Sequence, residues 1–268
     1  MTALSDLRLL VHAYCPSSYA LVRYLFDKGL HDKLEIIPLN PGNPVSLLRL
    51  VPSVPALASD GRIVAVDPLE PEFIEALLLN KNIRNYVPIS EHEVIERFTR
   101  SAKSSGYIML HVLLGGLSLD DLVSSEFTDM ATRTYFSGLS RDYIRSVLLS
   151  RAEAIERELL ESSVKSVAYS FIRDVLVSTD VDLEKLVDYR VLKLWSTAKL
   201  SQGIVYTPLR ELFLNSNIRK VLEYIQEHYD RLVKSFENFI AKLSSDTEVY
   251  RLLSEGNVRR RARSSTFS

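Results

Sequence analysis

The chain has 268 residues, of which 46% are hydrophobic and 25% are charged, and its formal net charge is −1. This composition is typical of a soluble protein large enough for two packed domains, and the balanced charge argues against nucleic acid or an anionic membrane as a partner. The single cysteine excludes an internal disulfide and a four-cysteine zinc site, as expected of a metal-free protein in the reducing cytoplasm.

Targeting and membrane signals are not visible in the sequence. The first residues do not combine a basic segment with an apolar core, so no signal peptide is expected. The longest apolar run without a formally charged residue, 107–119, is too short to span a bilayer. We therefore expect no membrane partner.

The first predicted elements meet at Cys15. The apolar run Leu7–Tyr14 predicts a strand that is buried on both faces, and Pro16 is typical of the first turn of a helix. Gly29 stands where a left-handed cap would end that helix. Cys15 is therefore predicted at a helix N-terminus, where the helix dipole and unpaired N–H groups can lower a thiol pKa well below ~8.5.

Further elements are predicted as far as residue 79. Asp60-Gly61 between two apolar runs is a strong hairpin signal, and Glu70 and Glu72 are typical of a helix N-terminus. The expected elements are a strand at 34–39, a helix at 45–51, two hairpin strands at 51–57 and 62–66, and a helix at 73–79.

This order of elements resembles the thioredoxin-like domain of glutaredoxins and, more closely, that of glutathione transferases. Cys15-Pro16-Ser17-Ser18 follows the first strand, as in monothiol glutaredoxins and cysteine-type transferases. Val54-Pro55-Ala56-Leu57 is similar to the Val-Pro-x-Leu of the transferases, and the Asp60-Gly61 hairpin and Asp67 come next. The resemblance covers about the first 79 residues.

The resemblance implies a cis peptide bond before Pro55 and a ligand thiol held by the backbone of Val54. Cys15 would be the nucleophile or the mixed-disulfide partner, and the ligand would be glutathione or another small thiol. One departure concerns Asp67-Pro68, because the family usually has an acidic residue followed by Ser at this point, holding the γ-glutamyl end of glutathione. Pro68 supplies neither the hydroxyl nor the backbone N–H of that serine.

From residue 90 onward the sequence predicts only helices. Ser90 and Glu93 form a capping box at the start of this part. Apolar side chains at helical spacing then predict helices at 90–114, 143–161, 164–177, 183–200 and 218–243, with a mixed helical connection at 118–134.

The predicted fold class is α/β plus all-α, because a thioredoxin-like domain is followed by a helical bundle. We expect the thioredoxin-like domain at 1–79, a linker at 80–89, the helical domain at 90–253 and a basic tail at 254–268. The tail contains Arg259-Arg260-Arg261-Ala262-Arg263, which could dock on RNA or an acidic partner but is more simply a solvated chain end.

Several candidate residues allow two interpretations. Cys15 is either a reactive thiol or a small buried apolar side chain, and without a second cysteine only an external thiol could resolve its disulfide. Ser17 and Ser18 either supply a hydroxyl to the chemistry or cap the helix. Asp67 either binds the ligand or caps the following helix.

Three more residues could belong either to a functional site or to the hydrophobic core. Tyr107 and His111 lie four residues apart on one predicted helix face, where they either line the pocket for an electrophilic substrate or pack in the core. His12, three residues before Cys15, either approaches the pocket or is a hydrogen-bonded core histidine.

The sequence thus predicts a thiol-dependent transferase or monothiol oxidoreductase with Cys15 as its nucleophile, in a cleft between the two domains. Its partners would be a small thiol and an electrophilic substrate, and family habit implies a homodimer. The alternative is a non-catalytic interaction module with a protein partner, which the Asp67-Pro68 departure fits and which the fold by itself does not exclude.

Overall fold

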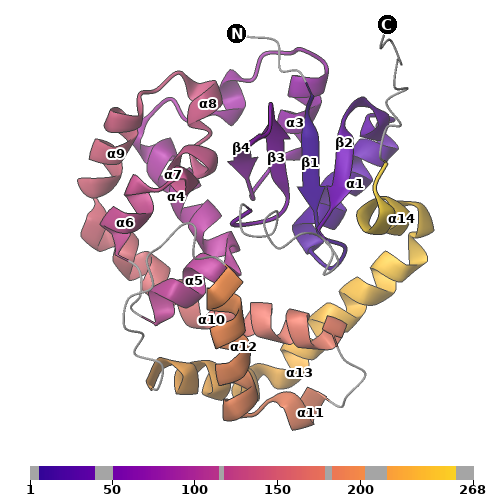
Figure 1. Ribbon diagram of the computed structural model, residues 1–268, viewed down its shortest axis with the longest axis vertical. Helices are drawn as coiled ribbons and strands as arrows, with labels where there is room; N and C mark the ends of the chain where they lie inside the picture. The colour runs from indigo at the N-terminus through magenta and orange to yellow at the C-terminus, as the bar shows by residue number, and fades with distance from the viewer. Residues whose placement is uncertain (1–5, 40–50, 115–117, 179–182, 203–215, 258–268) are drawn as a thin grey trace, which may run out of the picture.

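The computed structural model describes residues 6–39, 51–114, 118–178, 183–202 and 216–257. An α/β part comes first and an all-α part follows, which confirms the predicted fold class (Figure 1). Nearly all of the helix predicted at 45–51, and most of the predicted basic tail, lie outside the described residues.

The α/β part is built on a four-stranded sheet with the order β2-β1-β3-β4. The central strand β1 (Arg8–Val11) pairs in parallel with β2 (Glu35–Pro38) and antiparallel with β3 (Ala56–Ser59). The last strand, β4 (Arg62–Val66), forms a hairpin with β3. A parallel pair needs a crossover connection, and helix α1 (Pro16–Asp27) supplies it between β1 and β2.

Turn and cap residues in this part adopt the conformations that the sequence predicts. Asp60 and Gly61 have φ values of 51° and 79°, as a two-residue hairpin with two positive φ angles requires. Gly29, with φ of 63°, follows the end of α1, and the N–H of Leu30 donates to the carbonyl of Leu25 across the cap. Helix α3 (Pro71–Leu78) and two short 3-10 turns, η1 (His31–Lys33) and η2 (Arg84–Tyr86), complete the part.

The predicted capping box opens the helical part. The hydroxyl of Ser90 accepts from the Glu93 N–H at 3.3 Å, and Glu93 Oε2 accepts from the Ser90 N–H at 3.1 Å. The helices are α4 (Glu91–Ser104), α5 (Gly106–Leu113), α6 (Leu119–Ser124), α7 (Glu126–Ala131), α8 (Thr134–Ser137), α9 (Arg141–Leu149), α10 (Ala152–Ser178), α11 (Leu183–Leu186), α12 (Tyr189–Gln202), α13 (Ser216–Ser245) and α14 (Thr247–Glu255).

Several helix boundaries differ from the sequence prediction. The helix expected at 143–161 is divided between α9 and α10, and the one expected at 183–200 is divided between α11 and α12. The single helix expected at 90–114 divides at Ser105, whose hydroxyl accepts from the Ile108 N–H at 3.3 Å and so caps α5. The break expected before 164 is absent from the long helix α10. Ser162 and Ser163 donate their hydroxyls to the carbonyls of Glu158 and Leu160, which keeps these polar side chains within a continuous helix.

The two faces of the sheet bury different side chains. Leu9 and Val11 belong to a core with α1 and α3, whereas Leu10 and Ala56 belong to the core that the helical part forms on the other face. Alternate residues of one strand point to opposite faces, so the apolar run of β1 serves both cores. This explains why the first strand is apolar without alternation.

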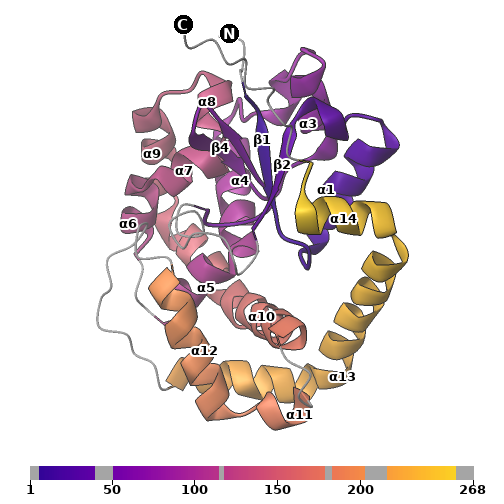
Figure 2. The same cartoon turned by 45° about the vertical axis from the view of Figure 1, so that its right-hand side comes forward.

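The C-terminal helix returns to the α/β part. Helix α13 bends at His228 and leads to α14, which lies beside α1 and β2 (Figure 2). Leu252 and Leu253 of α14 pack in the core of the sheet. The side chain of Asn257 accepts from the Ile36 N–H at 2.6 Å and donates to the Leu34 carbonyl at 3.1 Å. The segment expected as the end of the helical domain thus packs on the first module.

Candidate functional site

The predicted nucleophile lies where β1 passes into α1. Cys15 is the residue that precedes the first turn of α1, with φ of −102° and ψ of 117°, and Pro16 occupies the first turn. The Cys15 side chain is 6% exposed, and its thiol donates to the carbonyl of Val54 at 3.3 Å. The structure therefore brings together two residues that are 39 positions apart in the chain.

The loop that faces the thiol carries the cis peptide that the family resemblance implies. The Val54–Pro55 bond is cis, and so is Asp67–Pro68. The junction of α4 and α5 contacts this loop, because Ser105 donates its hydroxyl to the Pro52 carbonyl at 2.6 Å. The neighbouring Ser104 donates to the Asp67 carbonyl at 3.1 Å. Nothing in the local sequence signalled that the helical part holds this loop.

Burial changes the acidity of the predicted nucleophile. It raises the pKa of the Cys15 thiol above its ordinary value, and the nearby negative charge of Asp67 raises it further. The backbone N–H and hydroxyl of Ser18 and the charge of Arg173 act in the opposite direction. The helix N-terminus therefore has the predicted effect, but burial outweighs it, and the expectation of a lowered thiol pKa is wrong for this conformation.

Asp67 is the acidic group of the same corner. Its side chain is 7% exposed, and burial raises its pKa to about 6, although hydrogen bonds from the Ser104 and Ser17 hydroxyls lower it. Asp67 does not cap the following helix, because the residue before the first turn of α3 is Glu70. Of the two serines after Cys15, Ser17 thus interacts with Asp67 and Ser18 with the thiol.

A charged group from two helices of the helical part completes this region. It consists of Arg173 and Asp174 on α10 together with Trp195 and Lys199 on α12. Asp174 Oδ1 accepts from Arg173 Nε and Nη2 at 2.9 and 2.7 Å, and Oδ2 accepts from Lys199 Nζ and Trp195 Nε1 at 2.9 and 3.2 Å. The two positive groups hold the pKa of Asp174 down, at about 2, against the effect of burial.

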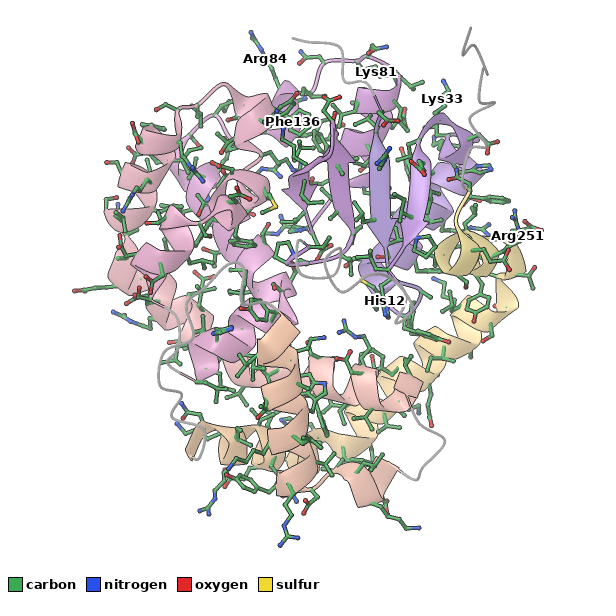
Figure 3. All side chains as sticks on the ribbon, in the orientation of Figure 1. His12, Lys33, Lys81, Arg84, Phe136 and Arg251 are labelled. Carbon is green, nitrogen blue, oxygen red and sulfur yellow. The ribbon has the colours of Figure 1, made fainter. Side chains whose placement is uncertain are left out.

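His12 adjoins the thiol corner, because its carbonyl accepts from the Cys15 N–H at 3.0 Å. Figure 3 shows it at the end of β1, on the side that faces the helical part. Its Nδ1 accepts from the Tyr14 N–H at 3.2 Å, so the neutral ring carries its hydrogen on Nε2. Burial lowers the pKa of His12 to about 4, and the positive charges of Arg173 and Lys199 contribute. His12 is therefore neutral at physiological pH.

The sequence reasoning missed the charged group on α10 and α12. A signal was present, because Arg173-Asp174 interrupts the otherwise apolar and small residues of 167–176. Adjacent opposite charges in the buried stretch of a helix usually have partners on another element. The partner, Lys199, lies on a different helix, and its position follows only from the tertiary packing.

Tyr107 and His111 are buried on α5 and contact each other, with ring centroids 4.6 Å apart. His111 is fully buried, and burial lowers its pKa to about 4, so its ring is neutral. Tyr107 belongs to the core that the helices share with one face of the sheet. This placement favours core packing over a pocket-lining role for both residues.

Comparison of the chain with protein-family models, with curated proteins and with solved structures found no match. Among the described residues, no group of three or more His, Cys, Asp or Glu side chains is placed to hold a metal ion. Over the same ranges, every helix is too short or too polar to cross a membrane. The case for a function therefore rests on the geometry of the Cys15 corner.

Proposed function

We propose that the protein is a thiol-dependent transferase or monothiol oxidoreductase, similar to a glutathione transferase, with Cys15 as its nucleophile. The observation that supports this most is the contact of the Cys15 thiol with the Val54 carbonyl, beside the cis Val54–Pro55 bond and at the start of α1. Ser18 and Arg173 both act to stabilise a thiolate at this position.

The oxidoreductase reaction is thiol–disulfide exchange. Cys15 loses its proton to solvent, and its thiolate attacks one sulfur of a small disulfide, whose other sulfur leaves as a thiolate. A small thiol such as glutathione, also deprotonated, then attacks the ligand sulfur of the mixed disulfide and releases the Cys15 thiolate. Each step forms one S–S bond and breaks one, so no further oxidant or reductant is needed.

The raised pKa of the Cys15 thiol gives this reaction a defined pH dependence. At neutral pH the thiol is mainly protonated and hydrogen-bonded to Val54, so the reactive thiolate is a minor form. Its fraction increases as the pH approaches the thiol pKa. The rate of attack is therefore expected to rise continuously above neutral pH.

A non-catalytic interaction module is the second candidate function. This alternative is favoured because Cys15 is only 6% exposed and the pKa of its thiol is raised. The Asp67-Pro68 pair also fits, because it lacks the hydroxyl and N–H that the transferases use at this position. In this case Cys15 would be a structural side chain of the corner.

The reactivity of the single cysteine separates the two functions. Iodoacetamide labelling of the folded chain across pH 6 to 10 reports on Cys15 alone, with Cys15→Ser as the background control. If the protein is an enzyme, labelling should increase with pH. The unmodified chain should also turn over hydroxyethyl disulfide with glutathione, and Cys15→Ser should abolish this activity. Labelling that occurs only after denaturation, with no turnover in the unmodified chain, would contradict the catalytic proposal.

A further inference from the structure

We propose that Arg173, supported by Lys199, binds a carboxylate of the small molecule that reacts at Cys15, so that the preferred thiols and disulfides are anionic. This inference rests on the proposed function for the location of the reacting sulfur. It concerns a subsite contributed by the helical part, which the resemblance of the first module does not assign.

The charge of the group on α10 and α12 is not balanced. Arg173 and Lys199 carry two positive charges, and both pair with the single carboxylate of Asp174. Trp195 Nε1 also donates to this carboxylate. Because a carboxylate carries a single negative charge, Asp174 offsets only one of the two cations. Within the part of the chain that the structure describes, this group therefore keeps one positive charge for another anion.

The guanidinium of Arg173 has a donor edge available. Its Nε and Nη2 donate to Asp174, whereas Nη1 makes no hydrogen bond to the part of the chain that the structure describes. The Arg173 side chain is 24% exposed and that of Lys199 is 22% exposed, so a small ligand can reach both. A planar guanidinium edge binds carboxylates well, because its parallel N–H groups match the two oxygens.

The position of the group fits a ligand whose sulfur is at Cys15. In Figures 1 and 2 the C-terminal half of α10 lies next to the end of the sheet where β1 passes to α1. His12, which Figure 3 shows at this end, faces the helical part. The charge of Arg173 acts on both His12 and Cys15, which is consistent with this arrangement.

The neighbouring carboxyl group of Asp67 does not pair with Arg173. Asp67 belongs to the corner of Cys15, where Ser17 and Ser104 are its hydrogen-bond partners. A ligand carboxylate on Arg173 would therefore add a charge-assisted pair without displacing one that exists. Such pairs contribute more than neutral hydrogen bonds, and one is expected to change an affinity or rate by about tenfold.

The test compares two disulfide reagents with Cys15 of the full chain. Ellman's reagent carries a carboxylate on each ring, and 4,4′-dithiodipyridine is neutral. The ratio of their rate constants isolates the anion effect, because the fraction of thiolate cancels. Arg173→Gln is expected to lower the ratio about tenfold, Lys199→Gln less, and Arg173→Lys less than Arg173→Gln. The control Arg157→Gln changes an exposed arginine of the same helix and leaves the ratio unchanged.

The outcomes separate this inference from the proposed function. If dithiodipyridine reacts and the ratio is the same in Arg173→Gln as in the unmodified chain, the subsite is refuted and the reactive thiol stands. If neither reagent reacts, the thiol chemistry is refuted. The subsite is then tested by calorimetry, in which S-methylglutathione is titrated into the Cys15→Ser variant and its affinity is measured. The subsite is supported if Cys15→Ser binds S-methylglutathione and the added Arg173→Gln substitution weakens this binding about tenfold. The subsite is overturned if Cys15→Ser does not bind S-methylglutathione, or if Arg173→Gln leaves the affinity unchanged.

Discussion

Replacement of Arg133 tests how the two parts of the chain are joined. This arginine is 1% exposed and lies between α7 and α8, and its guanidinium is 4.1 Å from the ring centroid of Phe73. It donates from Nη1 to the Tyr86 carbonyl at 2.6 Å and from Nη2 to the Pro68 carbonyl at 2.7 Å. Nη2 also pairs with Glu70 at the start of α3. One side chain therefore connects the helical part to three segments near the sheet.

Arg133→Met removes the charge and both carbonyl contacts but keeps an apolar stem over Phe73. The Tyr86 and Pro68 carbonyls lose their partner, and Glu70 keeps only Arg97, at 3.2 Å. Loss of one member of a buried ion pair typically costs about 3–5 kcal/mol, so we expect the free energy of unfolding to fall by about this amount. Arg133→Lys should lose less, because it keeps the charge but not the two-pronged geometry.

The assay is urea denaturation followed by circular dichroism. Arg84→Met is the matched control, because Figure 3 shows Arg84 projecting away from the molecule, and its loss should change the free energy of unfolding by less than about 0.5 kcal/mol. Equal effects of Arg84→Met and Arg133→Met would refute the reasoning. A double-mutant cycle of Arg133→Met with Glu70→Gln should show coupling, because the two side chains are in contact.

Three further predictions concern buried groups whose charge or hydrogen bonds depend on the fold. The folded pKa of Asp67 is about 6, above its usual 3.8, so its ionisation opposes folding by roughly 3 kcal/mol as the pH rises from about 4 to 6. Asp67→Asn should remove this part of the pH dependence in denaturation curves, and an unchanged pH profile would contradict it. The pKa of buried His111 is about 4 instead of 6.5, so stability is present above pH 6.5 and is lost as the pH falls toward 4. His111→Gln should therefore flatten the loss of stability over that range, and a loss as steep as in the unmodified chain would argue against a neutral buried ring. Asn257→Ala leaves the Ile36 N–H without its partner and should lower the free energy of unfolding by about 1–3 kcal/mol. In Asn257→Ala, hydrogen exchange should become faster in α14 than in the unmodified chain, with α5 as the reference helix. Equal protection of α14 in the variant and in the unmodified chain would show that the contact contributes nothing.

The structure agrees best with the sequence where an element depends on contacts within a few residues. The Asp60-Gly61 hairpin, the Gly29 cap and the Ser90–Glu93 capping box all formed as predicted. Their signals are local, because a turn or cap is satisfied by backbone groups two to four residues away. The division at Ser105 was missed, since its hydroxyl both caps α5 and bonds the distant Pro52 carbonyl.

The Cys15 corner was predictable in outline from the resemblance but not in its electrostatics. The order of motifs placed Cys15 opposite Val54-Pro55, and the cis bond before Pro55 is present. The direction of the thiol pKa shift could not be predicted, because the burial that controls it depends on packing between segments far apart in the sequence.

The sequence alone therefore determined the class of fold and the local turns and caps, and the family resemblance implied that a helix N-terminus meets a Val-Pro loop. Only the tertiary structure decided that α14 returns to the sheet and that Arg173 and Lys199 share Asp174 near Cys15. The physical reason is the distance along the chain over which each property is set. Backbone conformation and apolar periodicity are set by neighbouring residues, whereas the charge state of a buried group is set by whatever the fold places around it.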